Sequence, residues 1–223
     1  NLVIVVLLGA VLVKAKQHPE RESNREVMGQ IIRIGLPSAC ETAIYNVSMT
    51  LVIRFLNQMD AQGLNVTARS YTMQITNFSY CVGAALAQAN AIMTGWHIGA
   101  KEYDACDRGT KKAAVIGVIV AVILETVFTL CSGWIMQLFS KDPQMVSLVG
   151  KLLAIDIVLE IGRVTNLVYG QALKTSGDAV FPVVMGACFM ILCSVGGTYL
   201  FGIRLGLLAV GAYIGMAGDE CVR

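Results

Sequence analysis

Apolar stretches about 20 residues long recur along this chain, and they constrain its fold more than any other feature. An α-helix rises about 1.5 Å per residue, so a stretch of that length crosses the hydrocarbon core of a bilayer. Hydrophobic residues make up 56% of the sequence and charged residues 14%. Soluble domains carry about 25% charged residues. The sequence therefore predicts an all-α, polytopic membrane protein.

The apolar runs predict six transmembrane helices joined by polar segments. Their ranges are 34–56, 66–96, 113–139, 145–169, 181–201 and 206–221. We interpret residues 1–13 as the end of a preceding transmembrane helix, residues 14–33 as a cytoplasmic link and residues 34–223 as a six-helix transmembrane bundle. Because the chain starts inside an apolar run and has no initiator methionine, we expect it to be a fragment of a longer protein.

Lysine and arginine are unevenly distributed between the two sides of the predicted helices. The polar links 14–33 and 97–112, the hairpin 170–180 and the C-terminus hold eleven of them, whereas the opposite loops hold five. Basic residues gather on the cytoplasmic side of membrane proteins. We therefore expect a multi-pass protein of the cell membrane, with its long links and C-terminus in the cytoplasm. The basic links are expected to lie near anionic lipid rather than to bind nucleic acid.

One predicted transmembrane helix carries three charged residues on one face. Asp156, Glu160 and Arg163 share that face because the helix makes a turn every 3.6 residues or so. A charge in hydrocarbon costs at least about 2.5–3.5 kcal/mol, so these side chains are expected to line a wet cavity rather than contact lipid. We expect them to act in ion coupling or substrate binding. The alternative is that Glu160 only pairs with Arg163 as a structural lock.

A second acid lies at a similar depth on another predicted helix. Glu41 is about 15 Å from the cytoplasmic end of its helix, comparable to Glu160, and has no basic residue within a turn. Burial raises the pKa of a carboxyl and a nearby cation lowers it, so such a pair could bind and release a proton or a sodium ion. We predict a sodium site at Glu41, Asp156 and Glu160. Tyr45 and Asn166 are candidate contacts for substrate or ion, with interhelical hydrogen bonds as the alternative.

Other features are less informative about function. Glu125 is expected to be buried, with packing and function equally open. Arg54 and Arg69 flank an outer loop, where long basic side chains usually snorkel to the membrane surface. The seven cysteines lack zinc-finger spacing and are expected to be small, buried packing residues. No phosphate loop, zinc-binding helix or nucleophile elbow is present. We therefore expect neither an enzyme nor a cofactor, apart from sodium or protons as coupling ions.

Three passages of the sequence resemble the carboxyl-terminal half of multidrug and toxic compound extrusion (MATE) transporters. They are IGLPSACETAIYN, ANAIMTGWHIGAKEYDACDRGTKKA and LEIGRVTNLVYGQALKTSGDAVFPVV, and the ending GAYIGMAGDECVR is similar to the close of the family's last helix. The resemblance implies one half of a twelve-helix protein, in which two six-helix bundles face a central cleft. It also implies that Glu41 is the acid of the seventh helix, and that the tenth helix contributes Asp156, Glu160, Arg163 and Asn166.

The function that we predict is a secondary antiporter that exports organic cations or other xenobiotics in exchange for sodium ions or protons. It would work by alternating access of two six-helix bundles. The expected partners are a small organic cation, the lipid bilayer and the missing amino-terminal half of the same protein. One alternative is a lipid-linked oligosaccharide flippase of the same superfamily, which would need a more cationic cleft. Another is a non-transporting membrane receptor or scaffold, whose charged stripes would be fully paired.

Overall fold

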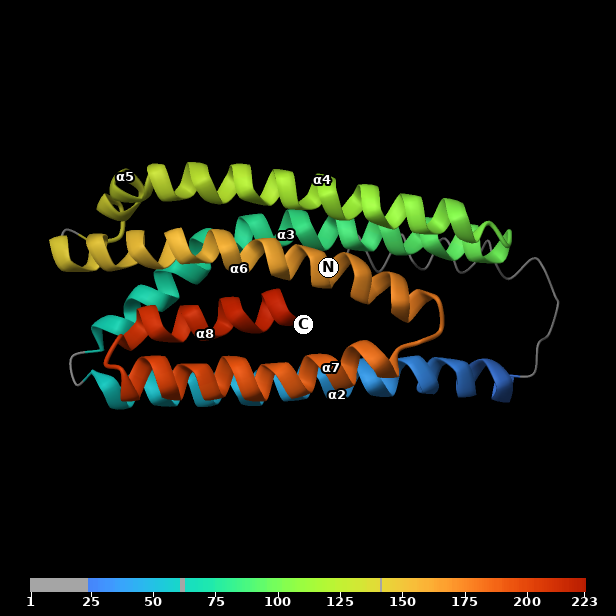
Figure 1. The fold of residues 1–223 in the computed structure, drawn as a ribbon, viewed down its shortest axis with the longest axis horizontal. Coiled ribbons are helices and arrows are strands. Elements are labelled where there is room, and N and C mark those ends of the chain that lie inside the picture. The colour runs from blue at the N-terminus through green and yellow to red at the C-terminus, as the bar shows by residue number, and fades with distance from the viewer. Residues whose placement is uncertain (1–23, 61–62, 141) are drawn as a thin grey trace. The chain divides into compact units, whose positions relative to one another are not determined.

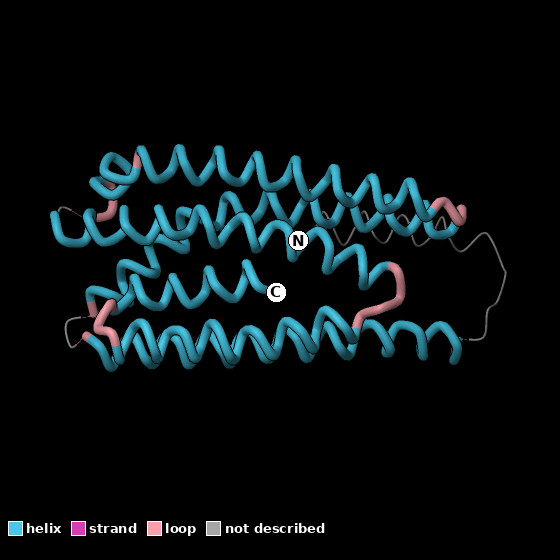
Figure 2. The backbone as a smooth tube through the Cα atoms, viewed as in Figure 1, coloured by secondary structure: helices cyan, strands magenta, loops and turns pink. Residues whose placement is uncertain are grey.

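The computed structural model describes residues 24–60, 63–140 and 142–223 (Figure 1). Within these ranges the chain is helical and contains no strand (Figure 2). This agrees with the predicted all-α fold. The predicted partial helix 1–13 and the first part of the link 14–33 lie outside the described residues. The chain divides into two compact units, residues 1–36 and 37–223, and the functional site described below lies within the second unit.

The helices are close to the predicted runs but are mostly longer. They are α2 (Asn24–Met59), α3 (Leu64–Gly99), α4 (Tyr103–Leu130), α5 (Ser132–Gln137), α6 (Pro143–Thr175), α7 (Val180–Phe189), the π-helices η1 (Met190–Val195) and η2 (Thr198–Arg204), and α8 (Leu208–Val222). Helix α6 begins with an N-cap, in which the Asp142 carboxylate accepts from the Gln144 backbone N–H at 3.0 Å. Pro143 follows at a position where its missing N–H causes no loss.

The predicted polar link 97–112 is wrong in its extent. Helix α3 continues to Gly99 and α4 begins at Tyr103, so the non-helical segment is only 100–102. Polar residues also form a helix when side-chain pairs one turn apart stabilise it. Lys111 and Asp107 form such an i,i+4 ion pair at 2.7 Å. The hairpin expected at 170–180 is also shorter than predicted. Helix α6 continues to Thr175 and α7 begins at Val180. Helix α2 likewise begins at Asn24, within the range expected to be a link.

Two helical segments are long and apolar enough to cross a membrane by length and composition, Tyr103–Leu130 and Val180–Arg204. The first has one exposed side and one buried side. Its large apolar side chains Ile116, Ile119 and Ile123 are each more than half exposed. The opposite side is buried and carries small residues, Ala114, Gly117 and Ala121. An exposed apolar stripe beside a buried face of small residues is the pattern of a membrane helix in a bundle.

Helix α6 is the centre of the unit formed by residues 37–223. It packs against α3, α4 and α8, and Figure 1 shows α8 beside it. Its buried residues Leu152, Leu153 and Leu159 join one core with Val52 of α2 and Tyr213 of α8. The core leaves polar side chains of α6 buried as well, and these form the candidate site.

The cysteines are not buried as expected. Five of the seven are exposed and the other two are partly exposed, and all seven are free thiols. Thiols are weakly polar, so lipid tolerates them on the outer surface of a helical bundle as well as a protein core does. Their position on apolar helices therefore did not distinguish a lipid-facing residue from a packed one.

Candidate functional site

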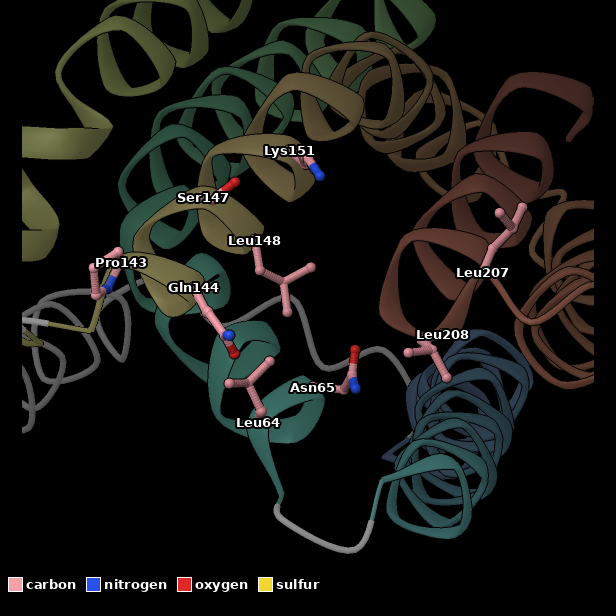
Figure 3. Close-up of a pocket in the computed structure, with 9 residues that line it drawn as sticks. All are labelled: Leu64, Asn65, Pro143, Gln144, Ser147, Leu148, Lys151, Leu207 and Leu208. Carbon is pink, nitrogen blue, oxygen red and sulfur yellow. The ribbon is translucent and has the colours of Figure 1, made fainter.

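Two hollows within the residues 37–223 could hold a small molecule. The first, of about 470 Å³, lies where the loop 205–207 meets the starts of α3 and α6 (Figure 3). Lys151 is the sole charged residue among the nine that line it. The Asn65 amide is already used, since it donates to Asp60 at 3.1 Å and accepts from the Ala209 backbone N–H at 3.2 Å. This hollow therefore offers few free polar groups for recognition.

The second hollow, the central cavity, has a volume of about 550 Å³ and is lined by residues of α2, α3, α6, η1 and α8. Four acids and four bases line it: Glu41, Asp156, Asp219, Glu220, Arg69, Arg163, Lys174 and Arg223. Drug-sized ligands occupy pockets of about 300–1,000 Å³, so this cavity has a suitable size. Its lining includes four of the predicted site residues, Glu41, Tyr45, Asp156 and Arg163.

Glu160 lies behind the cavity wall rather than in it. Its side chain is fully buried, and its Oε2 accepts from the Arg163 guanidinium at 2.7 Å. Asp156 is also buried, with 2% exposure, and contributes to the negative field around Arg163. One oxygen of each acid, Glu160 Oε1 and Asp156 Oδ2, has no hydrogen-bond partner among the described residues. Arg163 thus connects a buried acid pair to the cavity.

Glu41 is paired with a base that is distant in sequence. Its Oε2 accepts from Lys174 Nζ at 2.5 Å, across 133 residues of chain. The absence of a basic residue near Glu41 in the sequence is therefore not an absence in space. The pairing follows from the length of α6, because the last turn of this helix carries Lys174 to α2. Among the described residues, no group of three or more acids, histidines or cysteines has a metal-binding arrangement.

Asn166 forms interhelical hydrogen bonds, whereas Tyr45 lines the cavity. The Asn166 amide donates to the backbone carbonyl and the carboxylate of Glu220, both at 2.8 Å. Arg223 donates to the same carboxylate at 3.0 Å. Asn166 thereby links α6 to α8, which is the interhelical alternative considered for it. Tyr45 remains 43% exposed and lines the cavity, where its ring is free to contact a ligand.

Five of the eight charged residues that line the cavity were not selected from the sequence, and two of those five, Arg69 and Asp219, are buried. Arg69 is 4% exposed and lines the cavity, so the expectation that it snorkels to the membrane surface is wrong. Its place near the start of α3 suggested an outer position, but α2 covers it through Met49. Asp219 of α8 is also buried and accepts from the Ser194 hydroxyl at 2.8 Å. Arg54 is exposed, as expected.

Glu125 is a further buried acid next to the site. Its side chain is fully buried on α4, and neither carboxylate oxygen has a hydrogen-bond partner among the described residues. It lies close enough to Asp156 and Glu160 for electrostatic repulsion, which Arg163 and the nearby Ser79 hydroxyl oppose only in part. A buried group in this condition destabilises the fold.

We expect Glu125→Met to raise the free energy of unfolding by about 1 kcal/mol, because an apolar side chain of similar size removes an unpaired buried carboxyl. Thermal unfolding of the purified protein in detergent measures the change. Asp104→Asn, at an exposed position of the same helix, is the matched control and should leave the midpoint unchanged. A lower midpoint for Glu125→Met would contradict the prediction and indicate that the carboxyl makes a stabilising contact.

Comparison with known proteins identifies relatives of this arrangement. The MatE family model matches residues 37–200. The uncharacterized transporter YisQ of Bacillus subtilis is 33% identical over 99% of the chain and 48% of its own length. The probable multidrug resistance protein NorM of Pasteurella multocida is 22% identical over 70% of the chain and 33% of its own length. The chain thus spans about half the length of YisQ and about a third of the length of this NorM protein.

Solved structures share the fold. A crystal structure of MATE in the straight conformation superposes with a TM-score of 0.82 at 18% identity, over 99% of the chain and 51% of that protein. At this identity the match concerns the fold alone. It agrees with the predicted helical membrane bundle.

Proposed function

Because the chain belongs to the MatE family, we propose that it is the carboxyl-terminal six-helix half of a secondary antiporter that exports organic cations or other xenobiotics in exchange for sodium ions or protons. The relatives in this family are transporters rather than enzymes, which supports the proposal. We further propose that its long basic links and C-terminus lie in the cytoplasm. The partner would be a second six-helix half, with the cleft between the halves opening alternately to each side.

The observation that carries this proposal is a drug-sized cavity whose wall contains Arg163, the base of an ion pair with a buried acid. Arg163 lines the cavity, while its partner Glu160 is fully buried. The Arg163 guanidinium donates to Glu160 Oε2 at 2.7 Å. A coupling ion that neutralises Glu160 would release Arg163, and so change the charge that the cavity presents to substrate. An ion shifts a conformational equilibrium only by its difference in affinity for the two states. We propose that Glu160 provides that difference, with Asp156 beside it.

A second ion pair could respond to the same ion. Glu41 and Lys174 join α2 to the end of α6, and both line the cavity. Neutralising Glu41 would remove this link between the helices, which is the kind of two-state contact that rocking of a bundle requires. We propose that sodium or a proton competes with Lys174 for Glu41, as it competes with Arg163 for Glu160.

The alternatives fit the cavity less well. A lipid-linked oligosaccharide flippase would need a predominantly cationic cleft, whereas the lining has four acids and four bases. A non-transporting scaffold would have fully paired charges, yet Asp156 and Glu160 each keep one oxygen without a partner among the described residues. These observations favour a transporter over both alternatives.

Efflux of cationic dyes tests the proposal, with the complete gene product in vesicles and an imposed sodium or pH gradient. We expect Glu160→Gln to lower gradient-driven efflux at least tenfold, because the amide can neither gain nor lose the coupling charge. Glu102→Gln is the control, since its side chain is 60% exposed and far from the acid cluster in sequence.

The level of folded protein in the membrane is measured for both variants. Unchanged efflux from a Glu160→Gln protein present at the normal level would remove Glu160 from the coupling mechanism. Efflux that depends on neither gradient in the unaltered protein would refute antiport itself.

A further inference from the structure

Arg69 is a buried cation without an acidic partner. Its side chain is 4% exposed, and among the described residues no carboxylate lies within ion-pair distance of it. Its Nη2 contacts the Met49 sulfur at 3.4 Å, and a thioether is only a weak acceptor. Its Nε has no hydrogen-bond partner in the described part of the chain. A guanidinium in this setting still has most of its donors available for a ligand.

Arg69 borders the central cavity. It lines the cavity with Tyr80 of the same helix and with Tyr213, which is buried on α8. A buried, unpaired charge destabilises a fold, and a carboxylate relieves this through two parallel hydrogen bonds to the guanidinium. Because Arg69 is buried, lipid headgroups at the membrane surface cannot supply that anion. The missing anion is therefore expected to arrive with a ligand in the cavity.

The opposite charge is available in the same cavity. Asp156 lines it and has one carboxylate oxygen without a partner among the described residues. Met49 and Met73 also line the cavity and provide adaptable, weakly polar surface. An amphipathic molecule with a carboxylate, a cationic group and an apolar body matches these three features of the lining.

We propose that Arg69 binds the carboxylate of a zwitterionic organic substrate, whose cationic group is held on the side of Asp156. This inference rests on the proposed function and makes its substrate class more specific. Arg69 is a specificity-determining residue: it distinguishes a zwitterion from the corresponding simple cation. Its planar fork suits a carboxylate better than the point charge of a lysine does.

A matched pair of fluorescent probes tests this assignment. One is a cationic xanthene dye with a free carboxyl group, and the other is the methyl ester of the same dye, which lacks the negative charge. Binding of each dye to the purified complete gene product in detergent is measured by fluorescence anisotropy. We expect Arg69→Gln to raise the Kd for the acid at least tenfold and to change the Kd for the ester less than twofold. Arg54→Gln, at an exposed position, should change neither.

Arg69→Lys provides a second test. It keeps the charge but loses the fork, so we expect a Kd for the acid between those of the unaltered protein and Arg69→Gln, again with the ester unaffected. Equal losses for both dyes would mean that Arg69 has a structural role. No loss for either dye, or no binding of the acid by the unaltered protein, would overturn the proposal.

Transport measurements separate this proposal from the one on which it rests. If the acid binds through Arg69 but no gradient moves either dye, then antiport is refuted and the binding assignment stands. If a gradient drives efflux of both dyes and Arg69→Gln slows both or neither, then antiport stands and the assignment of Arg69 is refuted. The expected result is gradient-driven efflux of both dyes, with selective loss of the acid in Arg69→Gln.

Discussion

Replacement of Arg163 by methionine is expected to lower the free energy of unfolding of the protein by about 3–5 kcal/mol, the usual cost of breaking a buried ion pair from one side. Glu160 would keep its fully buried carboxylate but lose the guanidinium at 2.7 Å. Asp156 and Glu125 would remain close to it, and the cation that opposes their repulsion would be lost. The measurement is the thermal unfolding midpoint in detergent, together with the yield of folded protein.

The partner substitution distinguishes this electrostatic cause from a loss of packing. Adding Glu160→Gln to Arg163→Met should recover a large part of the stability, because the unpaired charge is then removed. A double-mutant cycle gives the coupling energy between the two residues directly. Arg108→Met, at an exposed position of α4, is the control for losing one arginine. A double variant no more stable than Arg163→Met would show that the ion pair is not the source of the effect.

The helical core of the fold could be predicted from the sequence because its signals are local. Apolar runs of membrane-spanning length located the helices, and the stripe Asp156, Glu160 and Arg163 was expected to avoid lipid. Asp156 and Glu160 are indeed buried. Helix ends were less predictable, since the composition marks where hydrocarbon ends and not where the helix ends. The segment 103–112 illustrates this, being polar and yet helical.

The pairings within the site depend on tertiary structure and were not predictable in the same way. Lys174 is too distant in sequence from Glu41 for any local pattern to connect them. Arg69 looked like a surface residue because it is near a loop, and only the packing of α2 against α3 places it in the cavity. Asn166 had two open roles, and the choice between them required the position of Glu220 on α8.

Substitution of Gly162 by alanine is the second change for which we expect a large effect, a loss of about 3 kcal/mol in the free energy of unfolding. A Cβ atom at this position of α6 would lie 2.5 Å from the backbone carbonyl carbon and oxygen of Glu220, and 2.9 Å from the Cys221 nitrogen. These are backbone atoms, so no side-chain rotation relieves the clash. Helix α8 would have to move away from α6, which would also stretch the hydrogen bonds from Asn166 to Glu220.

Gly170→Ala is a closely matched control, because Gly170 lies on the same helix and a Cβ there has nothing within 4 Å. Alanine is the better helix former by about 1 kcal/mol, so this variant should be as stable as the unaltered protein or slightly more stable. The opposite signs expected at two glycines of one helix separate close packing from helix propensity. Equal unfolding midpoints for Gly162→Ala and Gly170→Ala would mean that α6 and α8 are not in close contact. The link from Asn166 to α8 would then lose its structural basis, and with it the rigid wall that holds Arg163 and Asp156 at the cavity.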